Sequence, residues 1–154
     1  MKIRILAIAK KPKSWVKEGE GDFFKRIRNF TKIEIELIPP LDENSFEIQK
    51  TKKLESEKIL TKIRDDEFVI ACERLGESLD SESFARKLEK LRDDSRKIVF
   101  VIGGSHGFDS VVLEKANLQI SFSQLTFPHE LFRMMLLEQI YRAFTIFAGK
   151  KYHK

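Results

Sequence analysis

The chain has 154 residues, which is typical of a single domain, and we expect one domain over residues 1–154. The net charge of +5 permits an anionic partner such as a nucleic acid. The single cysteine excludes an internal disulfide framework and suits a reducing compartment, so we expect a cytoplasmic protein. Charged residues interrupt every apolar run before it is long enough to cross a bilayer, and we therefore expect no membrane partner.

Strands and helices alternate in the first half of the chain. Residues 2–9 are rich in β-branched side chains and predict a strand, and 14–30 carry apolar residues near helical spacing. Residues 32–38 alternate strictly between apolar and polar, which predicts a half-buried strand that ends before two prolines. Residues 44–64 predict a charged amphipathic helix with Ser45 as its N-cap.

The second half continues the alternation and sets the fold class. The expected elements are a central strand at 68–72 followed by a polar loop to Asp80, a helix around 84–91, a central strand at 97–102, a short helix from Asp109 to about Ala116, a strand at 118–122 and a helix at 130–148. Strands that alternate with helices predict an α/β fold, with a mostly parallel sheet and helices on both faces.

Two unusual loops follow strands in this half, at 103–107 and 123–129. In open parallel sheets, ligands bind beyond the carboxyl ends of the strands. All three histidines of the chain also lie after residue 102, at His106, His129 and His153. We therefore expect the functional site in the last third of the chain.

The helix expected at 130–148 has apolar side chains around nearly its whole circumference. Such a helix must be buried on all sides. A small domain of this kind normally leaves one face of its last helix in water, so the pattern favours a homodimer. A helix sunk within its own domain is the alternative.

The loop Gly103-Gly104-Ser105-His106-Gly107 matches the G-x-S-x-G pattern of hydrolases, in which Ser105 would be the nucleophile. The pattern is short, and few acidic residues lie between it and His153. Neither a Walker loop nor the G-x-G-x-x-G spacing of a dinucleotide site is present. The glycines also suit a loop whose bare backbone a ligand approaches closely.

The segment 121–129 combines hydroxyls and free backbone groups with apolar side chains, which suits a ligand similar to adenosine. The histidines and Cys72 have no metal-ligand spacing. The chain ends in Tyr152, His153 and Lys154, which could stack on a base, move a proton and contact a phosphate. The lysines of 10–13 are further candidates for phosphate contact.

Together, these motifs resemble the RlmH (YbeA) family of SPOUT-class RNA methyltransferases. The resemblance extends over the whole chain and is most specific over residues 102–154. The residues that carry it are Ile102, Gly103, Gly104, Gly107, the run from Ser121 to His129, Arg133, the run from Glu138 to Ala143, Tyr152, His153 and Lys154.

The resemblance implies a C-terminal trefoil (α/β) knot of the SPOUT type, which patterning does not predict. It also implies S-adenosyl-L-methionine as methyl donor and no metal. The residues expected to hold the donor are Cys72, Gly103, Gly104, Ser123, Gln124, Leu125, Thr126, Phe127 and Pro128. Relatives often have Leu-Asp where this chain has Cys72-Glu73, a change that a backbone contact would survive.

The implied reaction is methylation of N3 of a pseudouridine in 23S ribosomal RNA, in the large subunit or assembled ribosome, by a homodimer. The N3 proton must be lost, and we assign His153 as base or proton relay. Tyr152 would orient the substrate base, and Arg142 would bind phosphate or stabilise negative charge. The residues expected to contact RNA are Lys154, His129 and Arg133.

Three functions therefore make different predictions. A methyltransferase binds S-adenosyl-L-methionine without metal or ATP. A serine hydrolase is labelled at Ser105 by a fluorophosphonate. A non-catalytic ribosome-binding module shows salt-sensitive affinity for RNA and binds no small ligand.

Overall fold

The computed structural model describes residues 1–42 and 45–152. In chain order the elements are β1 (Lys2–Ile8), α1 (Ser14–Ile27), β2 (Lys32–Ile38), α2 (Ile48–Leu60), β3 (Glu67–Ser78), α3 (Ser81–Asp93), β4 (Lys97–Ile102), α4 (Ser110–Lys115), β5 (Leu118–Ser121) and α5 (His129–Phe147). The strand order is β2-β1-β4-β3-β5, and every neighbouring pair is parallel. The predicted α/β fold with a parallel sheet is confirmed.

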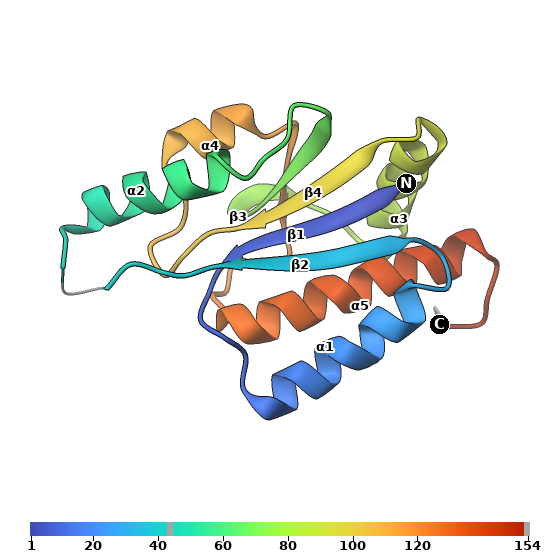
Figure 1. Cartoon of the computed structure of the whole chain (residues 1–154). Helices are drawn as coiled ribbons and strands as arrows, with labels where there is room; N and C mark the ends of the chain where they lie inside the picture. The colour runs from blue at the N-terminus through green and yellow to red at the C-terminus, as the bar shows by residue number, and fades with distance from the viewer. Residues whose placement is uncertain (43–44, 153–154) are drawn as a thin grey trace.

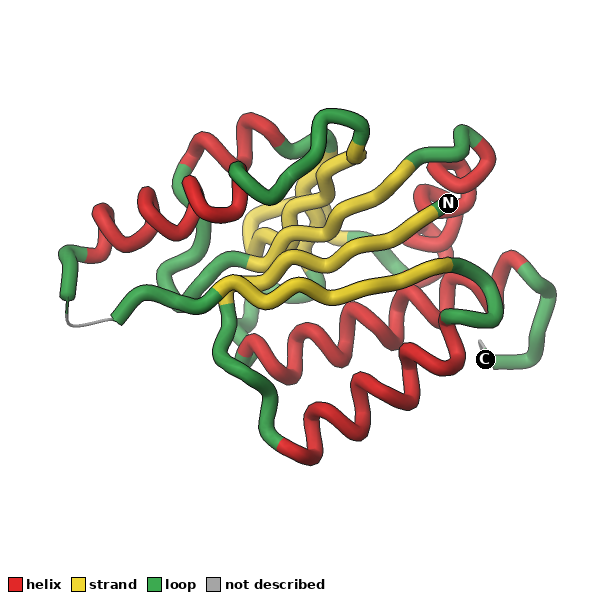
Figure 2. The backbone as a smooth tube through the Cα atoms, viewed as in Figure 1, coloured by secondary structure: helices red, strands yellow, loops and turns green. Residues whose placement is uncertain are grey.

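Helices cover both faces of the sheet, as Figures 1 and 2 show. Helices α1, α3 and α5 pack on one face, and α2 and α4 pack on the other. Successive side chains of a strand point to opposite faces, so the strands supply both cores. In β1, for example, Ile3 and Ile5 belong to the first core, while Leu6 and Ile8 belong to the second.

Helix α5 lies between α1 and α3, which explains much of its apolar sequence. Leu136, Leu137 and Ile140 are fully buried in the core between these helices and the sheet. The ring of Phe144 stacks on that of Phe30, with centroids 5.4 Å apart. Leu131, in the first turn, is the one residue of α5 classed as exposed. Packing within the chain therefore buries many of the apolar side chains of α5 that had indicated contact with a second subunit.

The predicted start of α2 is wrong. The helix begins at Ile48, with Glu47 rather than Ser45 at the N-cap position. Ser45 lies in a turn in which its backbone N–H donates to the Asp42 carbonyl (3.0 Å). Because that turn fixes the position of Ser45, its hydroxyl cannot cap a helix that starts three residues later.

Strand β3 is much longer than expected, because residues 73–78 form strand where their polarity predicted a loop. Cys72 pairs with Ile120, and after a register shift Glu77 pairs with Ile120 as well. Ser78 then pairs with Ser121. The intervening residues bulge outward between these two pairings, at the carboxyl ends of the strands.

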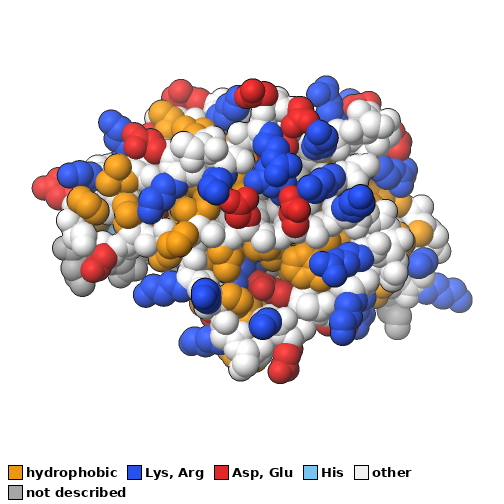
Figure 3. Space-filling view, in the orientation of Figure 1, with side chains coloured by type: hydrophobic (Ala, Val, Ile, Leu, Met, Phe, Trp, Pro, Cys, Tyr) orange, Lys and Arg blue, Asp and Glu red, His pale blue; other side chains and the backbone are white. Residues whose placement is uncertain are grey.

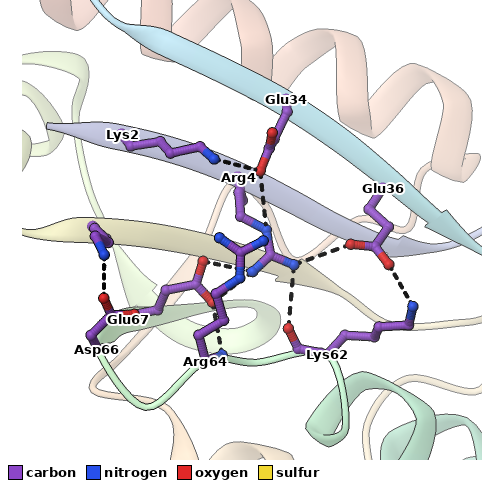
Figure 4. Close-up of polar contacts among 9 residues, drawn as sticks. Lys2, Arg4, Glu34, Glu36, Lys62, Arg64, Asp66 and Glu67 are labelled. Carbon is purple, nitrogen blue, oxygen red and sulfur yellow. Dashed lines mark hydrogen bonds and ion pairs between the residues drawn. The ribbon is translucent and has the colours of Figure 1, made fainter.

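A buried ion pair joins β1 to β3 near their amino ends (Figure 4). Arg4 Nη1 donates to both carboxylate oxygens of Glu67, at 2.7 and 2.8 Å. Arg4 Nη2 donates to Glu36 (3.1 Å) and to the Lys62 carbonyl (3.2 Å). The Arg4 side chain is 3% exposed and that of Glu67 is 2% exposed. Water therefore reaches neither charge, and each charge is stabilised mainly by the other.

Replacing Glu67 with alanine should therefore lower the free energy of unfolding by about 3–5 kcal/mol, because the Arg4 charge stays buried without its main partner. Glu34→Ala is the matched control. Glu34 pairs with Arg4 Nε at 3.5 Å but is half-exposed, so its loss should cost less than about 1 kcal/mol. Urea unfolding measures both variants, and equal losses would contradict this account of the pair.

Candidate cofactor pocket and catalytic tail

A cavity of about 700 Å³ opens at the carboxyl ends of β3, β4 and β5. Its walls are the loop after β4 (residues 103–108), the loop after β5 (123–129) and the bulge of β3 at 73–75. Phe122 and Phe132 add apolar surface. The two loops singled out in the sequence therefore form one pocket.

The loop after β4 is a tight turn. The Gly107 N–H donates to the Gly104 carbonyl (2.9 Å), and Gly107 has a φ of +77°. Gly104 has no room for a side chain, because a Cβ there would collide with Glu55 Oε2 and lie 3.1 Å from Ile8 Cγ2. Gly107 is thus required by the turn, and Gly104 by the close approach of α2.

Two buried side chains of α2 hold segments next to this loop. Glu55 Oε1 accepts a hydrogen bond from the Leu41 N–H (2.9 Å), and Ser56 Oγ accepts one from the Asp109 N–H (2.9 Å). Glu55 is 3% exposed, and its Oε2 has no hydrogen-bond partner among the described residues. Sequence reasoning missed Glu55, because nothing in a charged helix distinguishes the one carboxylate that faces inward.

The loop after β5 is held by short-range hydrogen bonds. Ser123 Oγ accepts from the Leu125 N–H (3.0 Å), and Ser121 Oγ donates to the Ser123 carbonyl (3.2 Å). Leu125 is 71% exposed at the rim of the cavity. Pro128 is the residue that precedes α5, with an extended ψ of 137° that ends the loop.

Most of the residues expected to hold the methyl donor line this cavity. They are Cys72, Gly103, Gly104, Ser123, Leu125, Thr126 and Phe127. Gln124 and Pro128 are not among the lining residues; Gln124 Nε2 instead donates to the Arg74 carbonyl (3.5 Å). Burial raises the pKa of the Cys72 thiol far above its ordinary value, so Cys72 stays a neutral wall residue.

His129 also lines the cavity, at the first position of α5. Burial lowers the pKa of His129, and the nearby positive charge of Arg133 lowers it further, while Glu55 acts in the opposite direction. The imidazole is therefore biased toward its neutral form. As a neutral ring it can donate or accept a hydrogen bond in the pocket, but it offers RNA little positive charge.

Arg133 lies in the interior, although the resemblance assigned it to RNA contact. Its side chain is 0% exposed, and its Nε donates to Glu20 Oε1 (2.7 Å) across the α1–α5 interface. Its Nη1 and Nη2 atoms have no hydrogen-bond partner in the part of the chain that the structure describes. In this arrangement the guanidinium links two helices and does not face solvent.

The candidate catalytic residues near the C-terminus form a second cluster around Glu138. Glu138 Oε1 accepts from Arg142 Nε (3.0 Å), from Arg142 Nη2 (2.6 Å) and from the Tyr152 hydroxyl (3.2 Å). The Arg142 guanidinium lies 4.9 Å from the centre of the Tyr152 ring. The carboxylate raises the pKa of Arg142, while burial and the same carboxylate raise that of Tyr152. His153 and Lys154 lie outside the described residues.

The two clusters are far apart within one chain. His129 and Arg142 are 13 residues apart on one helix, which at 1.5 Å per residue corresponds to about 20 Å along its axis. The sequence indicates a contact between Glu138 and Arg142, because side chains four residues apart on a helix are neighbours. The sequence does not indicate how far this cluster lies from the pocket, because that distance depends on where the pocket forms.

The sequence matches one known family over almost its whole length. Residues 1–153 match the family described as "Predicted SPOUT methyltransferase". The chain belongs to the SPOUT methyltransferase family. It is 42% identical, over 99% of both chains, to a protein of Caldicellulosiruptor saccharolyticus named ribosomal RNA large subunit methyltransferase H.

Two solved structures share the fold of this SPOUT protein. A methylase-family protein of Haemophilus influenzae Rd KW20 superposes with a TM-score of 0.56, at 17% identity, over 99% of this chain and 70% of the other. One from Neisseria gonorrhoeae superposes with a TM-score of 0.50, at 11% identity, over 91% and 81% of the two chains. Membership of this family favours methyl transfer over the serine hydrolase that the Ser105 pattern suggested.

The described residues contain neither a metal-binding cluster nor a helix that could span a membrane. No group of three or more His, Cys, Asp or Glu side chains is placed to hold a metal ion there. None of the helices described is both long enough and apolar enough to cross a bilayer.

Gly104→Ala should lower the free energy of unfolding by about 1–3 kcal/mol, because the new methyl group overlaps the Glu55 carboxylate. Gly21→Ala is the control. A Cβ at Gly21, within α1, has no neighbour inside 4 Å, so alanine there should stabilise the protein by about 0.5–1 kcal/mol. Thermal unfolding of both variants tests the contact, which a neutral effect at Gly104 would disprove.

Proposed function

We propose that this protein methylates N3 of a pseudouridine in 23S ribosomal RNA of the large subunit or assembled ribosome, using S-adenosyl-L-methionine. The observation that carries the proposal is the pocket between the 103–108 and 123–129 loops in a chain of the SPOUT family. The name of the relative with 42% identity supports the choice of ribosomal RNA as substrate. A cytoplasmic location and a knotted C-terminal segment belong to the same proposal.

The pocket fits the methyl donor in size and chemistry. Its volume of about 700 Å³ lies within the range of roughly 300–1,000 Å³ for small-molecule sites. Phe122, Phe127 and Phe132 offer apolar walls for an adenine ring. The backbone of Gly103 and Gly104 and the Ser123 hydroxyl offer hydrogen bonds for its polar edges. When bound, the donor supplies a methyl group made electrophilic by its sulfonium sulfur.

In the proposed reaction, a bond forms between N3 of the base and the methyl carbon as the bond from that carbon to sulfur breaks. The N3 proton passes to a base, for which His153 is the candidate, and S-adenosylhomocysteine is released. Tyr152 would orient the pseudouridine, and Arg142 would bind phosphate or stabilise negative charge. Glu138 positions both groups, since it accepts hydrogen bonds from each of them. Such positioning supplies much of the rate gain in group transfer.

The separation of pocket and tail supports a homodimer. We infer that the tail of one chain completes the pocket of the other, because Arg142 lies about 20 Å along α5 from the pocket residue His129 and Tyr152 donates to Glu138, which does not line the pocket. A second copy of the chain could bring its own Tyr152 and Arg142 to the open side of that pocket. Partly exposed apolar residues at the start of α5, including Leu131 at 39% exposure, would favour such contact.

The function is tested with purified protein and ribosomes that lack the modification. We expect S-adenosyl-L-methionine to bind in calorimetry and to transfer a labelled methyl group to N3 of one pseudouridine in 23S RNA. Thr126→Trp, which fills the pocket from an exposed position, should abolish both signals while the protein stays folded. Binding without methylation of ribosomal RNA would overturn the substrate, and no binding would overturn the methyltransferase.

Mixing two inactive variants tests whether the tail acts in the other subunit. His153→Ala keeps an intact pocket, and Thr126→Trp keeps an intact tail. If a pocket and a tail from different chains form each site, random re-association should restore about a quarter of the wild-type activity, since half of the dimers are mixed and each has one complete site. If each chain uses its own tail, no activity returns.

A further inference from the structure

The exposed large apolar side chains among the described residues lie at one edge of the sheet. Six of them lie in a segment that follows the carboxyl end of a strand, or in the first turn of the helix after it, and the seventh lies in the bulge of β3. The six are Trp15, Phe46, Ile48, Val111, Leu125 and Leu131, and the seventh is Leu75. This edge also holds the cofactor pocket, and Figure 1 shows it on the left, where the strand arrows end. A grouping of this kind marks an interaction surface.

The most strongly charged part of this edge is the β1–α1 connection with the first turn of α1. Residues 10–17 contain four lysines and no acidic residue. The lysines are Lys10, Lys11, Lys13 and Lys17, and all four are exposed. None of them forms an ion pair with any residue in the ranges described. In Figure 3, blue side chains gather over this connection at the lower left.

Helix α1 presents Trp15 beside these lysines. Val16 is fully buried and anchors the first turn, so the neighbouring positions 15 and 17 turn away from the core. Trp15 is 53% exposed, and its ring packs against no other aromatic ring of the described chain. An indole and several ammonium groups therefore face solvent together.

This segment lies next to the pocket. Strand β1 pairs directly with β4, with Ala7 opposite Ile102, so the two connections start side by side at the same edge. Ile8 also lies close to Gly104, since a Cβ there would be 3.1 Å from Ile8 Cγ2. A macromolecule bound at 10–17 would therefore lie alongside the loop that forms the pocket wall.

We propose that residues 10–17 form a docking surface for ribosomal RNA, in which the lysines contact phosphates and Trp15 stacks on an unpaired base. The inference rests on the proposed function and names the surface that the substrate occupies. Proteins hold unpaired RNA by this combination, since phosphates attract ammonium groups and every base offers a face for stacking. An uncompensated charge of +4 within eight residues complements a polyanion.

The test compares Lys10→Ala/Lys11→Ala/Lys13→Ala with a control at the opposite edge, Lys32→Ala/Lys90→Ala/Arg96→Ala. The control removes the same charge from exposed residues that form no ion pair within the described ranges. Binding to ribosomes that lack the modification is measured against salt concentration. The first variant should bind roughly tenfold to a hundredfold more weakly, with a salt slope smaller by about 2–3, because three phosphate contacts are lost. The control should match wild type.

Trp15→Ala tests stacking separately. It should weaken ribosome binding by about fivefold to a hundredfold while leaving the salt slope unchanged, and Trp15→Phe should restore part of the affinity. All variants should bind S-adenosylhomocysteine like wild type in calorimetry, which shows that the pocket is folded. Equal ribosome affinity for both lysine variants, with wild-type methylation intact, would overturn this surface alone. Failure of the wild-type protein to methylate ribosomes would instead overturn the proposed function.

Discussion

The parallel pairing of β3 with β4 on one side and with β5 on the other decides where the site forms. Parallel strands place all their carboxyl ends at one edge, so the loops after β4 and β5 meet across the end of β3. The bulge of β3 at 73–75 closes the third side. A cavity of about 700 Å³ results from loops that are separated by two elements in the sequence. The proposed methyl-donor site depends on the meeting of these loops.

Helix α5 connects the two halves of the proposed chemistry and also keeps them apart. Its first turn supplies His129 to the pocket, whereas its middle and second half carry Glu138 and Arg142, which contact the tail residue Tyr152. Helix α5 packs between α1 and α3 and is largely buried, and about 20 Å along its axis separates His129 from Arg142. This spacing supports the proposal that a second subunit completes the site.

Charged side chains have different roles at the two edges of the sheet. At the amino-terminal edge, Arg4 is bound by Glu67 and Glu36, and Lys97 pairs with Asp66, so these charges compensate one another. At the carboxyl-terminal edge, the lysines of 10–17 have no acidic partner among the described residues. The first arrangement stabilises the fold, whereas the second leaves positive charge available to a polyanion.

Sequence alone determined the alternation of strands and helices, the two ligand loops and the family, because local periodicity, glycine spacing and motif order are properties of neighbouring residues. It was wrong about the extent of β3, because pairing with β5 extends this strand over a polar segment. It also did not reveal that the α1–α5 interface buries the side chain of Arg133, a residue that we expected to contact RNA. The sequence also did not reveal that Glu55 lies against Gly104. Only the tertiary structure decides such positions, since a charged residue is solvated by water or by a distant partner, and its neighbours in sequence do not reveal which.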